Sequence, residues 1–281
     1  MADFTPRTLT TDIGQLTAYD HGAHIAQWSL HEVPVVWVSR RARYETGQPI
    51  RGGVPVCWPW FASGQDGTVS PSHGFVRVAG WHLAEQTPTE LRWRLTEADV
   101  QGLEGSRRFP HRFELVHEVE LADDGTGPVL EVSCTTLNPG DSPIRFEVAL
   151  HTYLHVGDVQ AVLLRGLDGV GYFDKVTGTD RTQQGDVRLT GETDRIYHSP
   201  GPLTLQDPVL ARDLHIRTEG ADSTVVWNPW ADKAAGLDDL ADDEWSRMVC
   251  LEAAALGDGG IELAPGERHC LTQRITVAGH R

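Results

Sequence analysis

Alternating apolar and polar residues dominate this chain, and that pattern constrains its fold more than any other feature. Segments of six to eleven residues alternate in this way, and clusters of Gly, Pro, Asn or Asp separate them. Side chains along a strand point to opposite faces with a period of two, so these segments predict successive antiparallel strands. The clearest cases are LRWRLTEA from Leu91, RFELVHEVEL from Arg112, VLEVSCTTL from Val129, IRFEVAL from Ile144 and ERHCLTQRITV from Glu267.

The segments between these strands also favour β structure. ADDGTGP (122–128) is typical of a hairpin loop, and LNPGDSP (137–143) connects the next two strands. Residues 50–74 are rich in glycine, proline and bulky aromatics and predict a long ordered loop, whereas 231–244 has the composition of an acidic linker. No internal repeat or break in composition divides the chain. We therefore predict one all-β domain over 1–281, a large twisted antiparallel β sandwich.

The charge balance limits the classes of partner. Forty acidic residues stand against 24 basic ones, a formal net charge of −16. Such a chain is not expected to bind nucleic acid or anionic membranes, which need a basic face, so any anionic ligand must be bound locally by a few arginines. The four cysteines are widely spaced and predict reduced thiols. Neither a secretory signal pattern nor a long apolar run is visible, and we expect a cytoplasmic protein.

Two short segments could bind a polar ligand. PSHGFVR places His73 and Arg77 on one turn, and RGGVPVCWPWF places Arg51 beside two glycines and ahead of Trp58 and Trp60. Glycines let the backbone approach a ligand closely, and flat aromatic rings suit the C–H faces of a sugar. Taken alone, the simpler interpretation is a solvated loop for the first segment and buried core tryptophans for the second.

Two further segments could carry acid–base chemistry. HTYLH holds His151 and His155, but residues four apart on a strand lie ~13 Å from each other, too far to share one metal ion. His151 could instead act as a general acid, or lie satisfied in the core. VCLEAA places Glu252 in an apolar strand, where a carboxylate is costly unless it is paired or faces a site. If a histidine partners Glu252 across the sheet, the two form an acid–base pair; otherwise Glu252 points to solvent.

Asp194 in ETDRIY could bind ligand hydroxyls or orient a catalytic group. It could equally form a surface pair with Arg195 of little energetic weight. No nucleophile elbow, P-loop or dinucleotide-binding fingerprint is present in the sequence.

Taken together and in order, these segments are more specific than any one of them. The set RGGVPVCWPWF, PSHGFVR, ALHTYLHVGD, GLDGVGYFDK, ETDRIY, VVWNPW, MVCLEAA and LAPGE resembles the ordered motifs of the hexose-6-phosphate mutarotases, or glucose-6-phosphate 1-epimerases. These form a branch of the aldose 1-epimerase family, and the resemblance runs from about Arg51 to the C-terminus. It implies a sandwich of the galactose-mutarotase type with a site in a cleft across one sheet.

The resemblance also implies roles for individual residues. His151 matches the general acid of the family and Glu252 matches its general base. Arg51, Arg77 and Asp194 fall on ligand-binding positions, and His73 falls beside the sugar. Ser72 stands where some relatives carry a ligand-binding glutamine, and its shorter side chain is expected to loosen or change sugar selection.

The implied activity is interconversion of the α and β anomers of a hexose 6-phosphate, with glucose 6-phosphate as the expected substrate and no cofactor. The arginines would bind the phosphate and His73 the hydroxyls. Two alternatives stay open: a mutarotase of neutral aldoses such as galactose or glucose, and a sugar-phosphate-binding sandwich without catalysis. We expect a monomer or weak homodimer.

Overall fold

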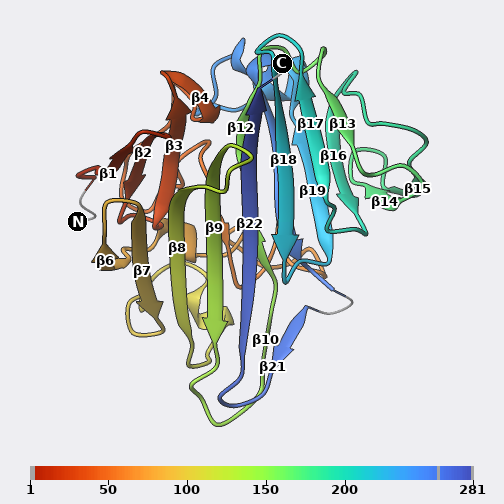
Figure 1. Ribbon diagram of the computed structural model, residues 1–281. Helices are drawn as coiled ribbons and strands as arrows, with labels where there is room; N and C mark the ends of the chain where they lie inside the picture. Colours follow the sequence, from red (N-terminus) through yellow and green to blue (C-terminus); the bar gives the residue numbers. More distant parts are fainter. Residues whose placement is uncertain (1–3, 258–259, 280–281) are drawn as a thin grey trace.

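The structure is a computed structural model, and it describes residues 4–257 and 260–279. Within these ranges the strands pair antiparallel and form a twelve-stranded sheet, an eight-stranded sheet and a two-stranded one (Figure 1). The predicted all-β sandwich is thus confirmed.

The first sheet contains, in spatial order, β1 (Arg7–Thr11), β2 (Gly14–Tyr19), β3 (His24–Leu30), β4 (Val33–Val36), β12 (Tyr153–His155), β20 (Met248–Ala255), β19 (Ser223–Asn228), β16 (Thr193–Tyr197), β14 (Gly171–Asp174) and β15 (Thr179–Thr182), with β11 (Val148–Leu150) joining β20 to β5 (Val56–Cys57). The second contains β13 (Leu163–Arg165), β17 (Leu203–Asp207), β18 (Arg212–Glu219), β22 (Arg268–Gly279), β9 (Pro128–Leu137), β8 (Glu114–Asp123), β7 (Glu90–Thr96) and β6 (His82–Gln86). The small sheet pairs β10 (Ile144–Phe146) with β21 (Ile261–Leu263). The helical turns are η1 (Val76–Val78), η2 (Ser106–Arg108), α1 (Trp230–Ala234) and η3 (Glu244–Arg247). None of the described helices is long and apolar enough to span a membrane.

The main core lies between the two large sheets. Trp28 and Leu251 of the first sheet belong to the same buried cluster as Trp93, Leu115 and Ile275 of the second. Full burial of an aliphatic side chain contributes about 1.5–3 kcal/mol, so the alternating apolar positions along each strand hold the two layers together.

The strand predicted over IRFEVAL is divided in the structure. β10 pairs with β21, whereas β11 belongs to the first sheet, and Glu147 separates them. The Glu147 carboxylate accepts the Phe61 backbone N–H at 2.8 Å, and its own N–H donates to the Pro59 carbonyl at 2.9 Å. These two bonds tie the break to the loop over 50–74. The LNPGDSP segment accordingly leads from one sheet to another.

The acidic segment over 231–244 does not behave as a linker. It contains most of α1 and packs on the outer face of the first sheet, where Ala234 and Leu240 are buried against Met248 and Cys250. The sequence prediction was wrong here because isolated apolar residues in short helical turns leave no periodic pattern.

The long loop over 50–74 is ordered by close backbone contacts. A Cβ atom added to Gly74, whose φ is +72°, would lie 1.8 Å from the Trp58 carbonyl oxygen. Gly74 therefore lets the PSHGFVR turn lie directly on the segment that follows Arg51. Trp58 is fully buried among phenylalanines, which supports the core interpretation of its ring over a sugar-binding one.

Replacing Gly74 with Ala is expected to destabilise the protein by about 2–5 kcal/mol, because the left-handed backbone and the displaced carbonyl both cost free energy. Gly67 in the same loop is the matched control. Its φ is +70°, but nothing lies within 4 Å of its added Cβ. Gly67→Ala should cost only about 1–2 kcal/mol in urea unfolding. Equal losses for both variants would contradict the close approach at Gly74.

Candidate active site

The direction of Glu252 follows from the alternation along β20. Val249, Leu251 and Ala253 belong to the main core, so Cys250 and Glu252 point to the opposite face. Loops cover that face as well, and Glu252 is only 1% exposed. Solvent exposure, one of the two interpretations of this carboxylate, is therefore wrong.

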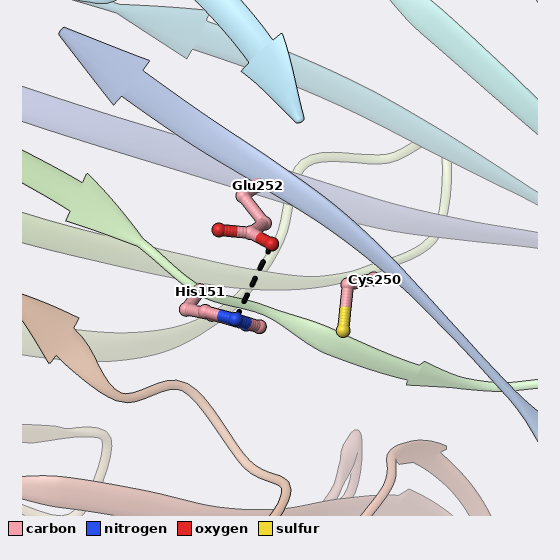
Figure 2. Close-up of side chains that lie close together, drawn as sticks. All are labelled: His151, Cys250 and Glu252. Carbon is pink, nitrogen blue, oxygen red and sulfur yellow. Dashed lines mark ion pairs between the residues drawn. The ribbon is translucent and has the colours of Figure 1, made fainter. Parts of the chain in front are cut away.

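His151 lies opposite Glu252, at the break between β11 and β12. Both of these strands pair with β20, and this pairing brings residues about a hundred positions apart together. The His151 Nε2 atom lies 3.4 Å from Glu252 Oε1 (Figure 2). The other carboxylate oxygen, Oε2, is buried and has no hydrogen-bond partner among the described residues. A buried polar atom of this kind calls for a partner from outside the chain, such as a water molecule or a ligand.

The surroundings disfavour charge on both members of the pair. Burial raises the pKa of Glu252 well above its usual value, and the charge of Asp194 raises it further. Burial lowers the pKa of His151 to about 3, and the charges of Arg77 and Arg51 act in the same direction. Both directions favour the uncharged forms, a protonated carboxyl group and a neutral imidazole. Perturbed, buried acid–base groups of this kind are typical of active sites.

The PSHGFVR turn lies beside the pair. The ring of His73 lies 5.4 Å from the ring of His151, and its Nδ1 atom accepts the Ala62 backbone N–H at 3.3 Å. Burial lowers the pKa of His73 well below its usual value, with the charge of Arg77 contributing. The ring is therefore neutral, and its proton is on Nε2, where it can be donated to a ligand.

Arg77 extends along the same turn. Its Nη2 atom donates to the Ser72 carbonyl at 2.6 Å. Among the residues that the structure describes, no carboxylate forms an ion pair with Arg77. Burial lowers the pKa of its guanidinium, as expected for an uncompensated cation. Ser72 contacts Arg77 through its backbone carbonyl, and the residue is exposed.

Arg51 is held differently. Its Nε atom lies 3.1 Å from Asp239 Oδ1, and its Nη1 atom donates to the Tyr153 hydroxyl at 3.1 Å. Tyr153 in turn stacks on His151, with ring centroids 4.9 Å apart. Sequence reasoning missed both partners of Arg51. Tyr153 lies two residues from His151 in HTYLH, whereas Asp239 lies in the segment that carries no pattern.

Asp194 pairs with Lys175, not with Arg195. The Lys175 Nζ atom lies 3.3 Å from Asp194 Oδ1 and 5.6 Å from the centre of the Phe61 ring. Lys175 also lines a cavity of about 630 Å³ together with Phe61 and Ile196. His151 and Glu252 are not among the residues lining this cavity. The lysine was missed, although it ends the motif GLDGVGYFDK.

His151 and His155 are not brought together in a common metal site. Among the described residues, His151 lies instead with Cys250 and Glu252. The potential ligand atoms of these three residues all lie within 4.8 Å of one another (Figure 2). Spacing within HTYLH could not reveal this group, because two of its members are on a different strand.

Comparison with known proteins decides the family. The sequence profile described as aldose 1-epimerase matches residues 7–276. The chain belongs to the aldose 1-epimerase family. The resemblance inferred from the motifs is thereby confirmed, and this aldose epimerase is an isomerase acting on carbohydrates.

Curated relatives of this aldose epimerase cover most of its length. A protein of Escherichia coli K12, provisionally named glucose-6-phosphate 1-epimerase, is 33% identical over 264 residues, which are 92% of this chain and 85% of that protein. A protein of the grass Cenchrus ciliaris with the same provisional name is 30% identical, covering 89% and 77%.

Solved structures agree on the architecture. The crystal structure of a protein from Salmonella typhimurium, provisionally described as a mutarotase, superposes with a TM-score of 0.84 at 26% identity, covering 97% of this aldose epimerase and 90% of that chain. An Escherichia coli K12 structure provisionally described as an aldose 1-epimerase has a TM-score of 0.75 at 16% identity, covering 98% and 99%, and supports the fold alone.

Proposed function

We propose that this aldose epimerase interconverts the α and β anomers of a hexose 6-phosphate, with glucose 6-phosphate as the foremost candidate. The proposal rests mainly on Arg77, which lies beside the His151–Glu252 pair. This cation has no carboxylate partner among the described residues. The provisional names of the curated relatives point to the same substrate.

The three cations around the pair are Arg51, Lys175 and Arg77, and only the first two have a carboxylate partner among the described residues. Arg51 has Asp239 and Lys175 has Asp194, each at ion-pair distance. A phosphate dianion would supply the charge that Arg77 lacks, and a planar guanidinium can bind two of its oxygens at once. We therefore assign the phosphate first to Arg77. Arg51 would lie beside it, held in place by Tyr153 and Asp239.

The register of the first sheet gives the distance between the cations on either side of the pair. Tyr153 pairs with Cys250, Cys250 with Trp227, and Trp227 with Asp194, in a row across four strands. At ~4.8 Å per strand this row spans ~14 Å. Arg51 contacts its Tyr153 end and Lys175 contacts its Asp194 end. A hexose ring would lie over the acid–base pair, with its phosphate at the arginine end.

Ring opening then uses the two members of the pair. Glu252, as carboxylate, accepts the proton of the C1 hydroxyl, and the O–H electron pair forms the C1=O1 double bond. The C1–O5 bond breaks, its electron pair goes to O5, and His151 as imidazolium donates a proton there. Rotation about C1–C2 and reversal of the proton transfers close the ring as the other anomer. Each step is general acid–base catalysis by these two side chains.

The reactive charge state differs from that of the free site by one proton transfer. Without ligand the pKa shifts favour the proton on Glu252, whereas the ring-opening step requires it on His151. The charge of Arg77 is one cause of the lowered pKa of His151. A phosphate on Arg77 would offset that charge and make the imidazolium less costly. The same charge of Arg77 lowers the pKa of Glu252, so the offset would also make the carboxylate more costly, and we assign the phosphate a binding role alone.

Exchange NMR of the anomeric signals tests the substrate. Glucose 6-phosphate, glucose and galactose are each measured with and without protein, so that spontaneous exchange sets the baseline. We expect selective acceleration for the phosphate ester. Acceleration confined to the free sugars would contradict the proposal and indicate a neutral-aldose mutarotase. Binding of glucose 6-phosphate without acceleration would indicate a sugar-phosphate-binding protein.

A further inference from the structure

The cluster of His151, Cys250 and Glu252 has a property that acid–base catalysis does not use. Cys250 and Glu252 are two residues apart on β20 and share its outer face, and His151 lies opposite them (Figure 2). Their imidazole nitrogen, thiol sulfur and carboxylate oxygen all lie within 4.8 Å of one another. A buried group of one N, one S and one O donor is the ligand type that Zn²⁺ and Cd²⁺ prefer.

One of the three donor–donor distances already suits a tetrahedral ion. Zinc lies ~2.0 Å from imidazole nitrogen and carboxylate oxygen and ~2.3 Å from thiolate sulfur, so two N or O ligands of one ion are ~3.3 Å apart. His151 Nε2 and Glu252 Oε1 are 3.4 Å apart. The third donor atom is the sulfur of Cys250. Side-chain rotations that move it by about 1 Å would bring it within the ligand sphere of a tetrahedral ion.

Two independent observations favour a cation here. Glu252 Oε2 is buried without a hydrogen-bond partner among the described residues, so the carboxylate has unused acceptor capacity. Net charge points the same way. A lone thiolate or carboxylate is costly at this depth, but a divalent ion bound by one thiolate, one carboxylate and one neutral imidazole forms a complex with no net charge.

We propose that His151, Cys250 and Glu252 form an inhibitory site for a thiophilic divalent cation, for which Zn²⁺ and Cd²⁺ are the probes. The three side chains supply three tetrahedral positions, and the fourth is left for water or another small ligand. An ion bound there occupies the lone pairs of both members of the acid–base pair. It therefore competes with the sugar. The competition rests on the proposed function, whereas binding of the ion does not.

Cadmium titration tests binding without reference to activity. Cys270 is exposed and would supply an unrelated thiolate, so the titration uses a Cys270→Ser background. We expect an ultraviolet Cd²⁺–thiolate charge-transfer band that saturates at one ion per chain and is displaced by Zn²⁺. Cys250→Ser in this background should abolish the band. Cys134→Ser, which removes a buried thiol from the second sheet, should leave it intact and is the matched control.

Glu252→Gln provides a second test that keeps the thiol. Loss of even outer-shell partners of a metal typically lowers affinity 10–100-fold, so loss of a direct ligand should weaken Cd²⁺ binding at least ~100-fold. Circular dichroism checks that each variant is folded. A band that survives Cys250→Ser, or Cd²⁺ affinity unchanged in folded Glu252→Gln protein, would overturn the site.

The inhibitory part is tested in the anomer-exchange assay. Zn²⁺ should slow exchange competitively with the sugar phosphate, and a chelator should restore the rate. If cadmium binds through Cys250 but Zn²⁺ does not change the exchange rate, the claim that the ion inhibits the enzyme is wrong. If the protein accelerates no sugar at all, the proposed function fails, and the cadmium titration still judges the metal site separately.

Discussion

His151→Asn and Glu252→Gln are each expected to slow protein-catalysed anomer exchange of glucose 6-phosphate by about 10²–10⁴-fold, the usual contribution of a positioned general acid or base. Both substitutions keep the size of the side chain and remove its proton-transfer function. Because the two groups act on the same ring-opening step, the double variant should be about as slow as either single variant. Exchange NMR at matched protein concentrations measures all three.

His155→Asn is the matched control for this prediction. His155 shares the HTYLH segment with His151 but lies at the end of β12 and is half-buried. Its substitution should change the exchange rate by less than about threefold, within the range expected of positions remote from the chemistry. Near-normal rates for His151→Asn or Glu252→Gln would show that the acid and base are assigned to the wrong residues.

Arg77→Met is expected to lower kcat/KM for glucose 6-phosphate by about 30- to 5000-fold, since loss of one partner of a buried, hydrogen-bonded charge pair typically costs 2–5 kcal/mol. Methionine keeps much of the buried stem of the side chain. Free glucose has no phosphate for Arg77 to bind, so its exchange at matched protein concentration should change only a few-fold. The measurement is the ratio of the two losses.

Arg94→Met is the control for removal of an arginine as such. Arg94 is on β7 in the second sheet, where it pairs with Glu114 at 2.7 Å on the surface. Surface ion pairs contribute at most about 1 kcal/mol, and this substitution should leave both substrates unaffected. If Arg77→Met lowered the rates for glucose 6-phosphate and glucose equally, the assignment of the phosphate to Arg77 would be wrong.

Strand alternation predicted the architecture because burial between two sheets leaves a period of two in the sequence. The same pattern was least informative for β20, where all eight residues are buried. Loops cover the outer face of that strand, so Glu252 stood out by its charge and not by periodicity. The break at Glu147 escaped prediction because the apolar pattern of IRFEVAL continues across it.

The candidate site was only partly predictable from the sequence, because some of its residues lie in segments without a pattern or meet only in the folded chain. His151, Glu252, His73 and Arg77 were found as unusual residue types in short motifs, and the structure brings them together. Asp239, the partner of Arg51, and Lys175, the partner of Asp194, were not found. Asp239 lies in a segment without periodic pattern, and Lys175 meets Asp194 only through the folding of β14 and β16.

The acid–base role of His151 is tested by the rate of exchange between the α and β anomers of glucose 6-phosphate, measured by exchange NMR with wild-type protein and with His151→Asn. We predict clear acceleration over spontaneous exchange by the wild-type protein and loss of nearly all of it in the folded variant. Wild-type protein that leaves the spontaneous rate unchanged, or a variant that matches the wild type, would contradict it.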